Sequence, residues 1–182
     1  MKKQLKGEVV ILSLFHFMHH LYGLSLPPLF PLLKNHFGIG NIQVGLVVSM
    51  ISITMAVFQL PLGLYSDKFG RKKILSVCFS IMLAAVFFTS ISFAFWMVLL
   101  FQIILGIGMS GYHPVGLSAI ADLFPGKETG KAMSAQAIGG SLGVALAPII
   151  LGGLASFYGW RVPLRIIAFA GIPALGQKYY SS

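Results

Sequence analysis

The chain has little charge, and few of its charged residues are acidic. Only 9% of its 182 residues are charged, while 57% are hydrophobic; soluble domains carry about 25% charged residues. Asp and Glu together number four, against thirteen Lys and Arg. A composition this apolar is incompatible with a water-soluble globular surface, so it predicts an integral membrane protein.

Other features are also scarce or missing. The single cysteine, Cys78, excludes a disulfide within the chain. The sequence holds no His-Glu-x-x-His zinc motif, no Gly-x-Ser-x-Gly nucleophile motif and no phosphate-binding loop. We therefore expect neither an enzyme nor a cofactor. Any transport would be driven by an ion gradient rather than by nucleotide hydrolysis.

Long apolar runs predict six membrane-spanning helices joined by short connections. A membrane helix requires about 20 mostly apolar residues, and these runs are too long and continuous for the ~10-residue alternating strands of a membrane barrel. The first run also exceeds the ~7–15-residue core of a signal peptide, so we expect it to be retained. The sixth is short and contains Pro163 and Pro173. The predicted helices span residues 9–33, 42–65, 74–93, 96–121, 132–157 and 162–176.

The basic residues predict which side of the membrane each end faces. If the chain crosses at every run, ten of the thirteen basic residues fall on one side. An excess of Lys and Arg marks the cytoplasmic side, so we expect a multi-pass protein of the cell (inner) membrane with a cytoplasmic N-terminus. The positive charge then reflects topology, and no nucleic-acid partner is expected. The ten are Lys2, Lys3, Lys6, Lys68, Arg71, Lys72, Lys73, Lys127, Lys131 and Lys178; the other three are Lys34, Arg161 and Arg165.

Small residues recur at every fourth position in two predicted helices. Gly139 and Gly143 lie four apart in the fifth, and Gly106 precedes a serine by four in the fourth. This spacing lets helix backbones approach closely in lipid, which offers no hydrophobic drive for association. Pro148 in the fifth helix and Pro114 in the fourth each free a backbone carbonyl and permit a bend.

The most specific motif lies between the second and third predicted helices. It reads Gly63-Leu-Tyr-Ser-Asp67-Lys-Phe-Gly70-Arg71-Lys72-Lys73. It resembles the signature G-x-x-x-D-x-x-G-R-[RK]-[RK] of the major facilitator superfamily of transporters. Physically, Gly63 allows a close helix crossing, Gly70 permits a tight turn, and the basic run holds the loop in the cytoplasm. The resemblance implies that Asp67 docks on a helix N-terminus in a second half of the carrier and gates its outward-open state.

The resemblance covers almost the whole chain and implies its architecture. Asp122-Leu-Phe-Pro125, Gly130 and Gly159-Trp160-Arg161 stand where such carriers have similar residues. His16, Pro31-Leu-Leu, Gln59-x-Pro61-x-Gly63 and Tyr112-His113-Pro114 resemble more narrowly the fosmidomycin-resistance type of drug-efflux protein. The implied fold is an all-α six-transmembrane-helix bundle of two inverted three-helix repeats, half of a twelve-helix carrier. The implied function is secondary active transport of a small solute by alternating access, in the efflux direction.

Three departures from the family pattern bear on the coupling ion. The His-x-x-Asn-Asp of the first helix reads His16-x-x-His19-His20 here. Gln102 stands where many proton-coupled members have arginine, and the proline-glycine antiporter motif is only half kept, with Gly143 and Pro148. The sequence therefore leaves proton antiport open.

Four histidines are predicted to lie at one depth inside the bundle. His16, His19 and His20 share a helix face because they are three and four positions apart. His113, in the antiparallel fourth helix, lies at a similar distance from the cytoplasmic end. Ionisable groups in a membrane face a cavity or the bundle interior, so we predict a cavity for substrate or protons that is pH-sensitive, since histidine titrates near neutral pH. The predicted lining residues are His16, His19, His20, Gln59, Gln102, Tyr112, His113 and Gln136.

Several alternatives stay open. Each of these polar side chains could simply hydrogen-bond a neighbouring helix. Histidines four apart can also bind zinc; because no Cys or acid accompanies them, we predict no metal, but an intramembrane metal-binding protein remains a rival. Another rival is a non-transporting subunit or half-carrier that pairs with a partner. Because a second half is missing, we expect a truncated chain, inactive alone, whose partners are the lipid bilayer, a small-molecule substrate and a second six-helix half.

Overall fold

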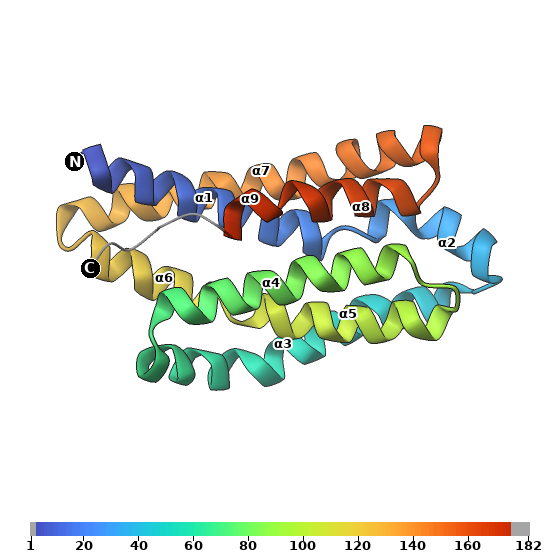
Figure 1. The fold of residues 1–182 in the computed structure, drawn as a ribbon, viewed down its shortest axis with the longest axis horizontal. Coiled ribbons are helices and arrows are strands. Elements are labelled where there is room, and N and C mark those ends of the chain that lie inside the picture. The colour runs from blue at the N-terminus through green and yellow to red at the C-terminus, as the bar shows by residue number, and fades with distance from the viewer. Residues whose placement is uncertain (1–2, 176–182) are drawn as a thin grey trace.

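The computed structural model describes residues 3–175, which fold into a bundle of antiparallel helices without a strand in that range (Figure 1). The elements are α1 Lys3–Gly23, the 3-10 helix η1 Pro27–Leu29, α2 Phe30–Phe37, α3 Asn41–Phe69, α4 Arg71–Ser90, α5 Phe95–Ser110, α6 Tyr112–Leu123, α7 Lys127–Tyr158, α8 Arg161–Ala170 and α9 Ile172–Leu175. Lys2, Lys178 and the last residue of the predicted sixth helix lie outside the described residues.

Five stretches are long and apolar enough to cross a membrane, namely Gly7–Phe37, Asn41–Phe69, Arg71–Ser90, Phe95–Leu123 and Lys127–Tyr158. The short helices α8 and α9 then run back along the bundle and form the sixth crossing (Figure 1). The turn between α3 and α4 and the turn between α6 and α7 lie at one end of the bundle (Figure 1). The turns before α3, α5 and α8 lie at the other end (Figure 1).

Two predicted helices are interrupted. The first crossing was predicted as one helix over residues 9–33, but α1 ends at Gly23 and η1 intervenes before α2. Pro27 and Pro28 explain this correction, because proline cannot donate a backbone hydrogen bond and disfavours helical geometry in the residue before it. The fourth crossing breaks at Gly111, three residues before Pro114, for the same reason. Both breaks are flanked by apolar residues, so hydropathy alone passes over them.

Helix ends extend further into polar sequence than predicted. The connection predicted over residues 66–73 is a single residue, Gly70, and α7 already begins at Lys127. Hydropathy marks the lipid-exposed part of a helix, whereas its backbone hydrogen bonds continue into polar flanks. Gly70 has φ +91°, a conformation that glycine adopts without steric cost. The predicted tight turn is therefore present, and it sets α3 directly against the start of α4.

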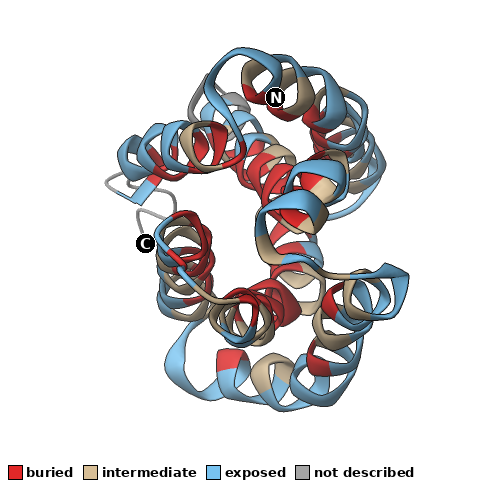
Figure 2. Cartoon of the chain, turned by 90° about the vertical axis from the view of Figure 1, so that its right-hand side faces the viewer, coloured by how far each residue is buried: buried red, intermediate tan, exposed pale blue. Residues whose placement is uncertain are grey.

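Three of the helix contacts follow the symmetry of two three-helix repeats, whereas the extensive contact of α4 with α5 has no counterpart of similar size between α1 and α8 or α9. The first crossing, α1, packs along the fifth, α7, and the second, α3, packs along the fourth, α5. The third, α4, packs against the sixth, α8. Exchanging the first, second and third crossings with the fourth, fifth and sixth maps these contacts onto one another, as inverted repeats require. Viewed along the bundle, buried residues face the inside and exposed ones the outside (Figure 2).

Close packing of α1 on α7 depends on two glycines. A methyl group at Gly139 would overlap the carbonyl oxygen of Ser13, and one at Gly143 would overlap the carbonyl oxygen of Phe17. Both obstacles are backbone atoms, which cannot rotate away. The small residues therefore allow the two helix backbones to touch, as the spacing predicted.

The other residues predicted to allow close helix packing differ in how near a neighbouring helix lies. A methyl group at Gly106 would lie 2.9 Å from the carbonyl oxygen of Ile51 in α3, so this glycine also marks a backbone contact. At Gly63 the nearest atom would be the Cβ of Pro114 at 3.5 Å, an ordinary distance that leaves room for alanine. Gly63 therefore lies beside Pro114 of α6, but the contact does not require glycine at this position. α7 continues through Pro148 without a break, and this proline lies on an exposed part of the helix.

Candidate functional site

The four histidines of the first and fourth crossings lie together in the interior. The ring centroid of His16 is 4.7 Å from that of His20 and 5.5 Å from that of His113. The ring of His19 is 4.9 Å from His113 and 5.1 Å from His20. At about 1.5 Å per residue, His16 lies roughly 20 Å along α1 from Lys3, near the middle of a span. These four residues are called the histidine cluster below.

Hydrogen bonds determine how His16 is protonated when neutral. Its Nδ1 lies 2.9 Å from the carbonyl oxygen of Gln136, which can only accept, so Nδ1 carries the proton and donates. Its Nε2 then has a lone pair, and the Nε2 of His20, 3.0 Å away, donates to it. The lone pair of His16 therefore points into the histidine cluster.

Tyr112 and Gln136 form a frame around His16. The Tyr112 ring stacks on His16 with centroids 5.0 Å apart and an interplanar angle of 23°. Its hydroxyl donates to the carbonyl oxygen of Leu12 at 2.8 Å and accepts from the side-chain amide of Gln136 at 2.9 Å. The sequence predicted both residues as lining, and they reach the cluster from α6 and α7.

His19 is the least satisfied polar group of the cluster. Its side chain is 1% exposed, and neither ring nitrogen has a hydrogen-bond partner among the residues that the structure describes. An unmade hydrogen bond of a buried polar group costs about 1–3 kcal/mol. The alternative that this histidine only hydrogen-bonds a neighbouring helix is therefore not supported.

Two predicted lining residues lie elsewhere. Gln102 is 1% exposed and donates its side-chain amide to the hydroxyl of Thr89 at 3.1 Å, so it connects α5 to α4. Gln59 lies on an exposed part of α3, where it lines a shallow hollow with Gly63 and Pro114. The residues that the structure groups are His16, His19, His20, Tyr112, His113 and Gln136.

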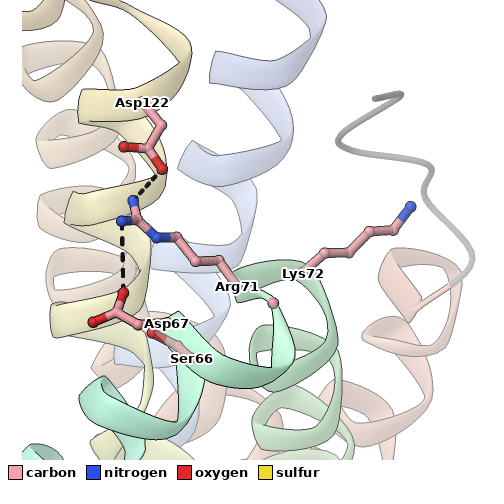
Figure 3. Close-up of a pocket in the computed structure, with 6 residues that line it drawn as sticks. Ser66, Asp67, Arg71, Lys72 and Asp122 are labelled. Carbon is pink, nitrogen blue, oxygen red and sulfur yellow. Dashed lines mark ion pairs between the residues drawn. The ribbon is translucent and has the colours of Figure 1, made fainter.

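A second polar group lies where α3, α4 and α6 meet. The Nη1 of Arg71 is 2.6 Å from the Oδ2 of Asp122, and its Nη2 is 3.7 Å from the Oδ1 of Asp67 (Figure 3). Lys72 points away from these acids (Figure 3), and Lys73 is exposed. This group, called the arginine bridge below, borders a hollow of about 430 Å³ whose lining is Ser66, Asp67, Gly70, Arg71, Lys72 and Asp122.

Sequence reasoning missed Asp122 as a partner of Arg71. Its only signal was its place in the resemblance to the transporter family, because two crossings separate it from Arg71 along the chain. The side chains of Asp67 and Asp122 are 67% and 56% exposed, and that of Arg71 is 23% exposed. Exposed ion pairs contribute only about 0–1 kcal/mol. The exposure of both acids therefore indicates that the arginine bridge contributes little to the stability of the fold.

Comparison with known proteins supplies relatives of this chain. The Bacillibactin exporter of Bacillus subtilis is 31% identical over 164 residues, which are 86% of this chain and 40% of that protein. The Fosmidomycin resistance protein of Escherichia coli is 24% identical over 178 residues, 95% of this chain and 44% of that protein. This chain thus spans less than half the length of these relatives.

The fold has solved counterparts. A bacterial homolog of the human lysosomal transporter Spinster, in an inward-facing and occupied conformation, superposes with a TM-score of 0.88 at 22% identity. The match covers 96% of this chain and 43% of that one. The family model of the Major Facilitator Superfamily matches residues 12–180. The chain belongs to the Major Facilitator Superfamily.

Proposed function

We propose that the chain forms the N-terminal half of a secondary active carrier that exports a small solute by alternating access. The observation that carries the proposal is the grouping of polar side chains at mid-depth, from helices of both repeats, around His16. Polar groups inside a membrane are costly and mark solute or ion pathways. The export direction rests on the likeness to an exporter and a resistance protein.

The arginine bridge acts as the gate of this half. It lies near the end of α6, and at about 1.5 Å per residue Asp122 is roughly 14 Å along the helix from His113. Substrate bound at the histidine cluster therefore does not touch it. Asp67 and Asp122 share one guanidinium through different nitrogens, and a small displacement of α3 against α6 changes which of the two ion pairs is closer. Such a weak, two-partner contact suits a conformational equilibrium.

A second six-helix half closes the cavity in this proposal. The most apolar stretches of α3 and α7 are only 11% and 28% buried within the bundle, compared with 44–56% for the other three long spans. Large exposed apolar faces require lipid or protein cover. Lipid covers part of them, and the second half covers the faces of α3 and α7 beside the cavity, where substrate binds between halves.

Transport by a completed carrier tests the proposal. The chain is co-expressed with the C-terminal half of the Bacillibactin exporter, and everted membrane vesicles are assayed for energy-dependent uptake of a panel of labelled organic anions and cations. Uptake above that of vesicles with either half alone is the expected result. Co-purification of the halves without any uptake would instead support a non-transporting subunit.

The gate is tested in the same vesicles. Asp67→Asn should lower the maximal rate several-fold and leave the half-saturating substrate concentration nearly unchanged, because Asp67 contacts Arg71 and not the histidine cluster. Lys68→Gln is the matched control, since it changes a charge at the next residue without removing an acid from the arginine bridge, and it should transport normally. A large loss of apparent affinity at unchanged maximal rate in Asp67→Asn would contradict a gating role.

A further inference from the structure

We propose that His16, His20 and His113 bind one divalent transition-metal ion of the zinc type. One ring nitrogen of each residue can be chosen so that all three lie within 4.8 Å of one another. A tetrahedral Zn²⁺ site with Zn–N bonds of about 2.0–2.1 Å places its ligand atoms roughly 3.3 Å apart. Two of the three nitrogens, those of His16 and His20, are already 3.0 Å apart. Small ring rotations therefore complete the site.

His16 is already oriented as a metal ligand. Metal-binding histidines donate their second ring N–H to a carbonyl or carboxylate, which determines the tautomer and aims the other nitrogen at the ion. The Nδ1–H of His16 donates to the carbonyl oxygen of Gln136, so Nε2 is the ring nitrogen whose lone pair can bind the ion. Stacking on Tyr112 holds the ring in place. At present this lone pair accepts the N–H of His20, a proton that metal binding would displace to the other ring nitrogen.

His19 gives a second, independent indication of a ligand. It is 1% exposed, its ring is 4.9 Å from that of His113, and its nitrogens have no partner in the described chain. Three imidazoles leave a fourth metal position open for water. A water held by the ion beside His19 would supply the missing hydrogen bond. Metal binding thus accounts for a buried polar group that packing leaves unexplained.

The donor set selects the class of ion. Neutral imidazoles suit Zn²⁺, Co²⁺, Ni²⁺ and Cu²⁺, whereas Mg²⁺ and Ca²⁺ prefer oxygen ligands. The sequence argument against a metal was the lack of Cys or acid, but three histidines alone hold zinc in open sites. His20 and His113 are only half-buried, so the ion lies at the edge of the cluster, where water or an anionic group reduces the cost of its charge.

Cobalt binding tests the site without any measurement of transport, so its outcome is separate from that of the proposed function. The full chain is purified in detergent with a tag that contains no histidine and is titrated with Co²⁺. We expect one ion per chain and the intense visible ligand-field bands of a four-coordinate site. Zn²⁺ should displace the Co²⁺, and Mg²⁺ should not. Loss of the bands upon Mg²⁺ addition, or their absence in wild-type protein, would overturn the proposal.

Variants identify the ligands. His16→Gln and His113→Gln should each weaken binding at least about tenfold, since even loss of an outer-shell partner costs about 10–100-fold. His36→Gln is the matched control, because His36 lies in α2 near Trp160 and Arg161, outside the cluster, and it should bind like wild type. His113→Cys retains three ligands and should add a thiolate-to-cobalt charge-transfer band. Equal binding by His113→Gln and wild type, or a His113→Cys protein without the new band, would refute the assignment.

Discussion

Alanine at Gly139 should destabilise the bundle by separating α1 from α7. The new methyl group would overlap the carbonyl oxygen of Ser13 and lie 2.9 Å and 3.0 Å from its carbonyl carbon and Cα. Favourable carbon contacts lie at about 3.5–4.0 Å, so α1 must withdraw by roughly 0.5–1 Å. Gaps of that size forfeit a quarter to a half of each neighbouring contact, and overpacking typically costs about 1–3 kcal/mol. We expect a loss of this size in the free energy of unfolding.

A second glycine in the same helix provides the control. Gly153 has no atom within 4 Å of an added methyl group, so Gly153→Ala should leave stability unchanged or raise it by up to about 1 kcal/mol through helix propensity. Both variants are unfolded by SDS in mixed micelles, and helix content is followed by circular dichroism. Equal stabilities of the Gly139→Ala and Gly153→Ala proteins would refute the close contact of the two backbones. Gly139→Ala with Gly143→Ala should cost less than the sum of the single changes, because both force the same separation.

Three further predictions concern topology, the frame of His16 and the gate. Cysteine placed at Asn41 should react with an impermeant thiol reagent from outside intact cells and cysteine at Lys72 should not, because basic loops stay in the cytoplasm; the reverse pattern would invert the topology. Tyr112→Phe should lower the free energy of unfolding by about 1–3 kcal/mol, since it leaves the buried side-chain amide of Gln136 without its acceptor. Tyr65→Phe, at a half-exposed ring, should have no effect. Similar losses in both variants would show that the Tyr112 hydroxyl does not stabilise the surroundings of His16. Asp122→Asn should lower the free energy of unfolding by less than about 1 kcal/mol because its ion pair is exposed. It should nevertheless slow transport by a completed carrier. An unchanged transport rate would exclude Asp122 from the gate.

Local patterns predicted the membrane class and the six crossings because these follow from the cost of polar backbone and side chains in lipid. The break at Pro27 was missed, although proline was visible there, whereas the break at Gly111 lies three residues before Pro114, where a bend was expected. The reason is that an apolar run does not change its hydropathy when its backbone turns. Similarly, polar residues at helix ends concealed that α3 and α4 are separated by Gly70 alone.

Contacts between crossings needed the tertiary structure. The sequence predicted one face for the three histidines of α1, and this follows from helical periodicity alone. It could not decide that His113 faces them while Gln102 turns toward Thr89, because this depends on how α5 and α6 are rotated about their axes. Nor could it pair Arg71 with Asp122, which the bundle brings to 2.6 Å.

By itself, the sequence determined that this protein is a membrane bundle with the gating motif of a transporter family, because hydropathy, charge asymmetry and motif spacing are properties of neighbouring residues. Only the tertiary structure decided which polar groups meet. It united three imidazoles from two repeats into a candidate metal site, left His19 buried without a partner in the described chain, and brought Gly139, but not Gly63, into backbone contact. Each of these outcomes depends on the rotation and depth of one helix relative to another. The hydropathy pattern of a helix does not determine its rotation, because several rotations bury small and polar residues equally well.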